Sequence, residues 1–228
     1  MIWRVNMAMF PVKTEARSAV TIAILAKAPI PGLAKTRLIP RLGAEGAAAL
    51  QHWLLQRAVQ TAMQAGIGPL SLWCTPDIQH PAFAVYSDSA RISLHQQPEG
   101  DLGQRMHRAI SASSQATIVI GTDCPMLTPE LLRQAANALK EYDAVVIPAE
   151  DGGYVLIGLR QANQTIFRGI DWSTDQVMAQ SRQRLAESAL QWLELPPLWD
   201  VDHAQDFERL QISLPNELPA GIGRDTQQ

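Results

Sequence analysis

Apolar residues gather in short runs along this chain, and longer segments with helical spacing separate these runs. The first run, residues 19–26, is aliphatic and rich in β-branched side chains such as Ile22 and Ile24. A continuous run of this kind is typical of a strand buried on both faces of a parallel sheet. In residues 43–65 the apolar positions recur every three or four residues, which predicts a helix ending at Gly66.

The same alternation continues through the rest of the chain. Thr128 followed by Pro129 is a helix N-terminal signature, and Asp202 is in position to cap the last helix. Further strands are predicted at residues 69–74, 91–95, 117–120, 143–148, 154–159 and 191–195. Strands that alternate with helices predict an α/β fold with a mostly parallel central sheet and helices on both faces.

The sequence predicts one domain, because it contains neither an internal repeat nor a convincing linker. We expect this domain over residues 19–214. Residues 1–18 are predicted to be an N-terminal extension, which lacks the long apolar centre of a signal peptide. Residues 215–228 are rich in proline and glycine at their start and are predicted to form a loose tail.

Composition narrows the classes of function. Of 228 residues, 46% are hydrophobic and 18% are charged, which is typical of a folded chain. The net charge of −3 argues against a broad nucleic-acid surface, and no apolar run approaches the roughly 18 residues of a membrane span. Cys74 and Cys124 cannot form a disulfide scaffold, so we expect free thiols and a cytoplasmic protein.

The loop after the first predicted strand carries three cations, Lys27, Lys35 and Arg37. It lacks the glycines of a P-loop. Its prolines, Pro31 among them, and Gly32 set the backbone shape of the loop. Ligands of open α/β sheets bind beyond the carboxyl ends of the strands, so these cations are placed to meet a phosphate. The alternative is an ordinary solvated surface loop.

Carboxylates follow the later predicted strands. Asp123 comes directly after the strand at 117–120, Asp151 follows the strand at 143–148, and Asp200 and Asp202 follow the last strand. Hard cations such as Mg²⁺ prefer carboxylate oxygens and often share them with substrate phosphates. The pattern therefore predicts a metal–phosphate site, although Asp202 alone is equally consistent with a helix cap.

Six motifs in unbroken order carry a resemblance to a known family. They are AKAPIPGLAKTRL, GDLGQRM, GTDCP, PAEDGGYVLIGL, FRGIDWST and DVDHAQDF, and they lie between Thr21 and Leu210. This series resembles a bacterial family of nucleotide-diphospho-sugar-transferase-like proteins, commonly labelled arsenosugar-biosynthesis-type glycosyltransferases. That family is related to MobA-like and 2-phospholactate guanylyltransferase-like nucleotidyltransferases. The resemblance implies a GT-A fold, which is Rossmann-like and binds a nucleotide at the loop after the first strand.

The resemblance also implies roles for residues within the motifs. Asp123 and Asp202 are the implied ligands of Mg²⁺ or Mn²⁺. Pro125 stands where the D-x-D signature of GT-A enzymes has its second aspartate, which makes the distant Asp202 the necessary partner. The implied nucleotide-binding residues are Lys27, Pro31, Gly32, Lys35, Arg37, Asp101, Arg105 and Thr122. The implied acceptor or sugar pocket consists of Gly152, Gly153, Tyr154, Trp172, Ser173 and Thr174.

Three functions are compatible with these residues. The first, and the one that the sequence favours, is a metal-dependent glycosyltransferase that moves a sugar from a nucleotide-diphosphate sugar to a small acceptor, with Asp151 as general base and Lys35 and Arg37 acting on the leaving group. The second is a nucleotidyltransferase that couples an NTP to a phosphorylated small molecule, and cations in the first loop suit its pyrophosphate leaving group. The third is a nucleotide-binding protein without catalysis. The fold does not decide among them.

Overall fold

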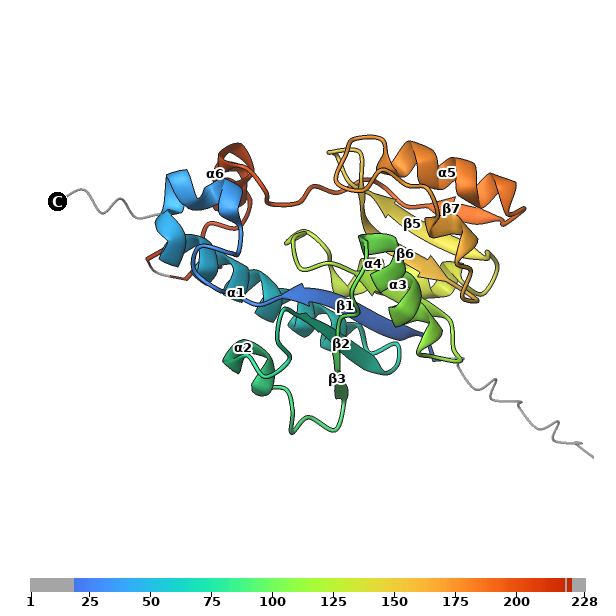
Figure 1. Ribbon diagram of the computed structural model, residues 1–228, viewed down its shortest axis with the longest axis horizontal. Coiled ribbons are helices and arrows are strands. Elements are labelled where there is room, and N and C mark those ends of the chain that lie inside the picture. Colours follow the sequence, from blue (N-terminus) through green and yellow to red (C-terminus); the bar gives the residue numbers. More distant parts are fainter. Residues whose placement is uncertain (1–18, 220, 223–228) are drawn as a thin grey trace, which may run out of the picture.

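In the described residues, 19–219, 221 and 222, the computed structural model has a seven-stranded central sheet in the order β3-β2-β1-β4-β6-β5-β7 (Figure 1). The predicted extension, residues 1–18, and part of the predicted tail lie outside the described residues. The strands are β1 (Thr21–Lys27), β2 (Leu70–Thr75), β3 (Ile92–Gln96), β4 (Thr117–Ile120), β5 (Ala144–Pro148), β6 (Tyr154–Leu159) and β7 (Trp192–Glu194).

Most neighbouring strands are parallel, as the sequence predicts. β1 pairs in parallel with β2 and β4, β2 with β3, and β5 with β7. β6 is antiparallel to both β4 and β5. The reason is local: the short loop 149–153 joins β5 to β6, and a connection of this length allows only an antiparallel pair. As a result, the beginning of β6 lies at the same edge of the sheet as the carboxyl ends of the other strands.

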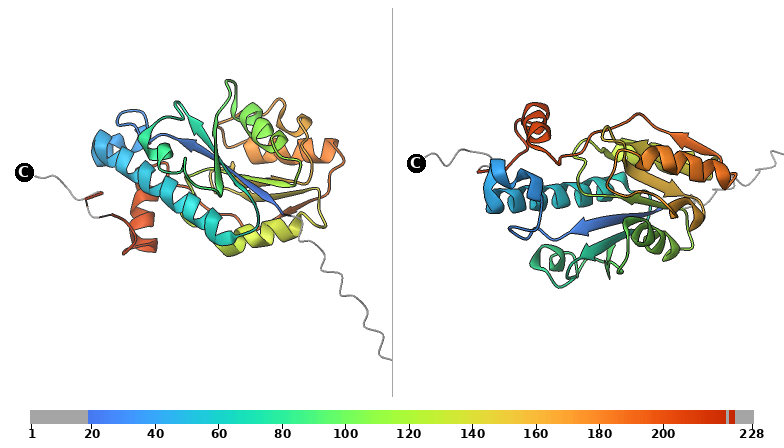
Figure 2. Two further views of the ribbon diagram at one scale, coloured as in Figure 1. Left: turned by 90° about the horizontal axis from the view of Figure 1, so that it is seen from below. Right: turned by 45° about the horizontal axis from the view of Figure 1, so that its top comes forward.

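Helices cover both faces of this sheet, which confirms the predicted layer structure (Figure 2). Helices α1 (Ile39–Ala65) and α4 (Pro129–Ala138) pack on one face. Helices α3 (Leu102–Ser111) and α5 (Val177–Glu187) pack on the other. The remaining helices are α2 (Pro81–Ala84), α6 (Ala204–Ser213) and the 3₁₀ turns η1 (Thr36–Leu38) and η2 (Thr165–Phe167).

The continuous apolar run of β1 follows from its burial on both faces. Successive side chains of a strand point to opposite faces. Ile22 and Ile24 pack against Leu55 of α1, whereas Ala23 belongs to the core that contains Met106 of α3. Residues 22–24 are buried whichever face they point to, so all three are apolar.

Helix α6 packs on the first half of α1 and forms a separate core there. Phe207 and Leu210 of α6 are fully buried against Leu50 of α1. Within the described part of the predicted tail, Leu218 and the buried Ile222 join this cluster. This packing holds the chain between β7 and α6 across the loop that follows β1. None of the helices in the described part of the chain has the length and apolarity needed to cross a membrane.

The starts of two helices differ from the prediction. Helix α1 begins at Ile39, before the predicted start at Gly43, because the chain forms a first turn after Leu38 and then kinks at Gly43, whose φ is 70°. Residue His203, and not Asp202, is the N-cap of α6, because the Asp202 carboxylate is turned toward the loop after β1. The predicted cap at Thr128 is confirmed, since its side chain accepts a hydrogen bond from Leu131 N.

Candidate active site

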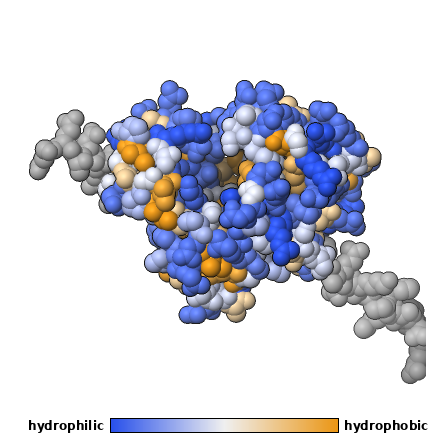
Figure 3. All heavy atoms as spheres, in the orientation of Figure 1, coloured by the Kyte–Doolittle hydropathy of each residue, from blue (hydrophilic) through white to orange (hydrophobic). Residues whose placement is uncertain are grey.

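A pocket of about 690 Å³ opens at the edge of the sheet where β1, β4 and β5 end. Figure 3 shows a hollow with an apolar floor between the part of the molecule that carries α6 and the part that carries α5. Most of the predicted site residues line this pocket: Lys27, Lys35, Arg37, Arg105, Thr122, Asp123, Asp151, Gly153, Tyr154, Trp172, Ser173, Thr174 and Asp202. The sheet therefore brings together side chains that are dispersed along the sequence.

Four predicted residues do not line the pocket, namely Pro31, Gly32, Asp101 and Gly152. Asp101 is the N-cap of α3: its carboxylate accepts a hydrogen bond from Gln104 N, and the Gln104 side chain accepts one from Asp101 N. This arrangement supports the start of α3, where Arg105 reaches the pocket. Gly32 has a φ of 80° and shapes the loop after β1.

Lys35 lies at the centre of the charged end of the pocket. Its ammonium donates to Asp123 Oδ1 at 2.8 Å, to Asp202 Oδ1 at 2.9 Å and to the carbonyl of Val201 at 2.6 Å. Only 4% of its side chain is exposed. Burial alone would lower the pKa of Lys35, but the charges of Asp123 and then Asp202 outweigh burial, so the pKa is raised. Lys35 is therefore a charged link between the β4 and β7 loops.

Arg37 adds a second cation on the solvent side of this link. It donates to Asp202 Oδ2 at 3.2 Å and 59% of its side chain is exposed. The two carboxylate oxygens of Asp202 are thus divided between Lys35 and Arg37. Exposed pairs of this kind contribute little to stability, so most of the Arg37 guanidinium is free to meet a ligand in the pocket.

Thr122 holds the carboxylate of Asp123 at the pocket wall. Its buried hydroxyl donates to Asp123 Oδ1 at 3.3 Å and accepts from Gln51 Nε2 at 3.1 Å. The Gln51 amide of α1 also donates to the carbonyl of Lys27 at 3.3 Å. This buried amide joins the ends of β1 and β4. Gln51 was not predicted as a site residue, because a glutamine inside a helix carries no signal of its own.

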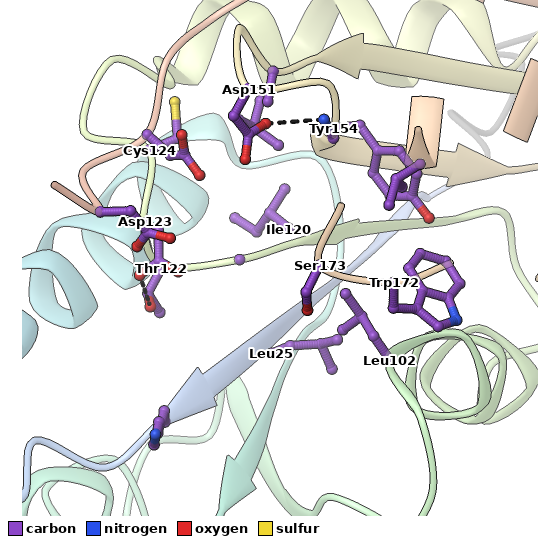
Figure 4. A pocket seen from close by; sticks show the side chains of 18 of the residues that line it. Leu25, Leu102, Ile120, Thr122, Asp123, Cys124, Asp151, Tyr154, Trp172 and Ser173 are labelled. Carbon is purple, nitrogen blue, oxygen red and sulfur yellow. Dashed lines mark hydrogen bonds between the residues drawn. The ribbon is translucent and has the colours of Figure 1, made fainter. Parts of the chain in front are cut away.

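Aromatic and aliphatic side chains form the opposite end of the pocket (Figure 4). The ring of Tyr154 meets Trp172 edge to face, with the centroids 6.4 Å apart. The Tyr154 hydroxyl donates to Met106 Sδ at 3.6 Å, and burial raises the pKa of Tyr154. Leu25 and Leu102 extend the same apolar surface. One end of the pocket is therefore suited to charged groups and the other to an apolar or aromatic part of a ligand.

The loop between β5 and β6 packs closely on the beginning of α5. Asp151 Oδ1 accepts a hydrogen bond from Gly153 N at 2.9 Å, which closes a tight turn. The carbonyl of Gly152 accepts from Met178 N at 2.8 Å. Ser173, on the facing loop, has a left-handed backbone with a φ of 66° and points toward the pocket in Figure 4. The two loops thus form one wall of the pocket.

Cys124 also lines the pocket, beside Asp123. Burial, as the main cause, raises the pKa of its thiol to about 12. A thiol with so high a pKa is protonated at neutral pH and is a poor nucleophile. Cys124 is a free cysteine, as the sequence predicts.

Asp200 completes the acidic side of the pocket. Burial is the main cause that raises the pKa of Asp200 to about 6, and the charges of Asp151, Asp202 and Asp123 add to it. From the sequence, Asp200 is one of the carboxylates of the predicted metal–phosphate site, without a role of its own. Only the structure shows that four carboxylates, contributed by three loops, lie near enough to influence each other.

The Asp200→Asn protein is expected to be more stable than the unchanged protein at pH 7.5 in EDTA. A carboxyl group whose pKa is higher in the folded state binds its proton more tightly there, so the free energy of unfolding falls as the pH rises through the window from about 4 to about 6. The substitution removes the group that causes this fall in stability. Thermal unfolding of both proteins between pH 4 and 8 measures the difference in Tm. We expect Asp200→Asn to have the higher Tm at pH 7.5 and the difference to vanish near pH 4.

The exposed Asp88, which is not among the residues that line the pocket, provides a matched control. The Asp88→Asn protein removes the same charge and should keep the pH dependence of the unchanged protein. If Asp200→Asn and Asp88→Asn give the same pH profile, burial and the neighbouring carboxylates do not raise the pKa of Asp200 as the structure indicates.

Comparison with known proteins shows that this chain is similar in fold to proteins described as nucleotide-utilising transferases. A crystal structure of a protein from Desulfovibrio desulfuricans G20, provisionally described as a nucleotide-diphospho-sugar transferase, superposes with a TM-score of 0.79 at 28% sequence identity, covering 89% of this chain and 92% of that one. The 4-diphosphocytidyl-2C-methyl-D-erythritol synthase of Anaerococcus prevotii shares the fold at 12% identity, with a TM-score of 0.60 and coverage of 87% and 97%.

The chain belongs to the family described as "Uncharacterized protein conserved in bacteria (DUF2064)", whose model matches residues 58–174, just over half of its length. A curated relative, the 2-phospho-L-lactate guanylyltransferase of Methanosarcina acetivorans, is 26% identical over 122 residues. That alignment covers 53% of each protein, so the chain matches about half the length of this relative. Together these findings confirm the resemblance that the six motifs indicate.

Proposed function

We propose that this protein is a nucleotidyltransferase that joins the nucleotide of an NTP to a phosphorylated small molecule and releases pyrophosphate. The observation that carries the proposal is the group of ion pairs at the charged end of the pocket. Lys35 contacts Asp123 and Asp202, and Arg37 contacts Asp202. Cations from the loop after β1 and carboxylates from later loops thus meet at one place. A departing pyrophosphate gains negative charge, which such cations stabilise.

The pocket gives each part of an NTP a suitable surface. The exposed Lys27 and Arg37 and the half-buried Arg105 line it on the side of β1 and α3, and they would bind the phosphates. The apolar end, with Leu25 and Leu102, would receive the base or the ribose. The guanylyltransferase activity in the name of the Methanosarcina relative makes GTP the first nucleotide to test.

Mg²⁺ or Mn²⁺ is part of the proposal, and the side chains of the pocket fit such an ion if substrate phosphates complete its coordination. Among residues 19–219, 221 and 222, no three His, Cys, Asp or Glu side chains form a group that would hold a metal ion by itself. Mg²⁺, however, is commonly bound by one or two carboxylates together with substrate phosphates. Asp123 and Asp202 would supply these carboxylates. The bound ion would neutralise charge that develops on the reacting phosphate.

The proposed reaction requires no general base. A phosphate oxygen of the acceptor forms a bond to the α-phosphorus, the bond from that phosphorus to the bridging oxygen breaks, and the electron pair leaves with pyrophosphate. Phosphate monoesters have a second pKa of about 6, so the attacking oxygen is already ionised at neutral pH. In this reaction Asp151 serves to shape the loop through its bond to Gly153 N.

Glycosyl transfer is the second candidate, and the match to the Desulfovibrio structure favours it. A hydroxyl acceptor would need a general base, and the exposed Asp151 lines the pocket where such a base would act. The absence of a second acidic residue at Pro125 weighs against this candidate. In both candidates we keep the cytoplasm as the proposed location, supported by the free thiols of Cys74 and Cys124.

Product analysis with the purified protein tests the proposal. The protein is incubated with each NTP, Mg²⁺ or Mn²⁺ and a panel of phosphorylated small acids, and pyrophosphate release is measured. Parallel reactions contain nucleotide-diphosphate sugars and hydroxyl acceptors. We expect pyrophosphate release, retained in the Asp151→Asn protein. Release of a nucleoside diphosphate that is lost in Asp151→Asn would instead establish glycosyl transfer, and nucleotide binding without turnover of either class would indicate the non-catalytic alternative.

A further inference from the structure

The ammonium of Lys35 has no hydrogen left to offer a phosphate. A lysine ammonium carries three donors. Three acceptors take them, namely Asp123 Oδ1, Asp202 Oδ1 and the carbonyl of Val201, all at 2.6–2.9 Å. In the arrangement shown by the structure, Lys35 is therefore bound to the protein itself. To contact a nucleotide phosphate, it must first give up at least one of these partners.

Local packing fixes the backbone from which Lys35 reaches these partners. Lys35 adopts the left-handed conformation, with φ 46° and ψ 47°, which is unusual for a residue other than glycine. Its neighbour Ala34 is fully buried, and so is Leu38 at the end of η1. The loop between these two anchors directs the side chain inward, whereas Arg37 from the same turn points to solvent. The packing of this loop thus fixes the inward position of the Lys35 side chain.

The ammonium also lies where a divalent ion would be expected. Asp123 and Asp202 are the carboxylates proposed to bind the metal, and each places one oxygen within 2.9 Å of Lys35 Nζ. The backbone supports their approach, because Val201 N donates to the carbonyl of Asp123 at 2.9 Å. Lys35 and a metal ion therefore share the same two ligands and carry charge of the same sign. Both cannot occupy this place together.

We propose that Lys35 is an internal counterion that makes metal binding conditional on the nucleotide. Without nucleotide, Lys35 holds Asp123 and Asp202 together and weakens their affinity for a free divalent ion. Nucleotide phosphates provide alternative acceptors for the ammonium, so Lys35 moves to the phosphates while the metal takes the carboxylates. Every charge keeps a partner in both arrangements. This inference rests on the proposed function, in which the pocket binds nucleotide phosphates and metal together.

Mn²⁺ binding, followed by electron paramagnetic resonance of the free ion, tests the inference without any turnover. The Lys35→Met protein is expected to bind Mn²⁺ in the absence of nucleotide about tenfold more tightly than the unchanged protein, a change within the usual range of coupling between sites. The Lys27→Met protein is the matched control. It removes the same charge from the pocket lining without removing a contact to Asp123 or Asp202, and its Mn²⁺ affinity should remain close to that of the unchanged protein.

A second measurement needs no variant. Addition of a non-hydrolysable GTP analogue should strengthen Mn²⁺ binding to the unchanged protein about tenfold, and Mn²⁺ should strengthen binding of the analogue by the same factor. This mutual effect should shrink in Lys35→Met. The inference is overturned if Lys35→Met binds Mn²⁺ no better than Lys27→Met, or if the analogue leaves the Mn²⁺ affinity of the unchanged protein as it was. Failure of the proposed function has a different signature, which is Mn²⁺ binding without turnover of any NTP.

Discussion

The Asp123→Asn protein is expected to stay folded and to lose at least about 100-fold in turnover, the size of loss seen when one electrostatic contact to a transition state is removed. Asparagine keeps the shape of the side chain and an oxygen that can accept from Lys35. It removes the negative charge that the proposed metal ion needs. Steady-state rates of pyrophosphate release, measured at saturating nucleotide, provide the test.

The fold of Asp123→Asn should survive because Lys35 keeps its other partners. Asp202 Oδ1 and the carbonyl of Val201 remain within 2.9 Å of the ammonium. Asp88→Asn again serves as the control with equal charge, since Asp88 lies outside the residues that line the pocket, and its turnover should match the unchanged protein. Turnover of Asp123→Asn within a few-fold of the control would show that the carboxylate of Asp123 does not act on the reacting phosphate.

The Gly152→Ala protein is expected to lose about 3 kcal/mol or more of its free energy of unfolding, because it combines backbone strain with a backbone clash. Gly152 has a φ of 92°, which side chains rarely tolerate. A Cβ at this position would collide with the carbonyl oxygen of Asp175 and would lie 2.6 Å from Asp175 Cα. Backbone atoms cannot turn aside as a flexible side chain can, so the two loops must separate. Denaturant unfolding measures the loss.

Two other glycine substitutions separate the cost of the clash from the cost of the backbone strain. Gly153→Ala places its Cβ 3.2 Å from the flexible carboxylate of Asp151, with no positive φ, and should be nearly neutral. Gly32→Ala meets nothing within 4 Å but has a φ of 80°, so it measures strain alone and should cost about 1 kcal/mol. A Gly152→Ala protein no less stable than Gly32→Ala would mean that the contact between the two loops is looser than the structure shows.

The alternation of elements was readable from the sequence because burial on both faces leaves a direct mark. The run around Ile22 and Ile24 predicted β1, and the Thr128–Pro129 signature predicted the start of α4. Elements with weaker sequence signals were missed or misplaced. The short helix α2 was not predicted, and α1 begins at Ile39, one turn before the predicted start at Gly43, where a non-helical residue separates this first turn from the rest of the helix.

The candidate site was predicted as a set of residues, although not as a set of contacts. The rule that ligands bind at the carboxyl ends of strands was sufficient to select Lys35, Arg37 and Asp123. Asp101 was assigned to the nucleotide because of its place in a motif, and the structure shows it capping α3 instead of lining the pocket. Local sequence does not distinguish a capping carboxylate from a ligand-binding one, since both stand at the start of a helix.

The residue pattern was sufficient to predict the class of fold, the edge of the sheet that holds the pocket and the kinds of side chain gathered there. Which of these side chains touch depends on the tertiary packing. Lys35 and Asp202 are 167 positions apart, and they meet because α6 packs on α1 and draws the β7 loop over the loop after β1. The partners of a buried ammonium are set by such long-range packing, which leaves no periodic signal in the sequence. For that reason Lys35 was predicted as a phosphate ligand, while the structure shows it bound to the carboxylates of the protein itself.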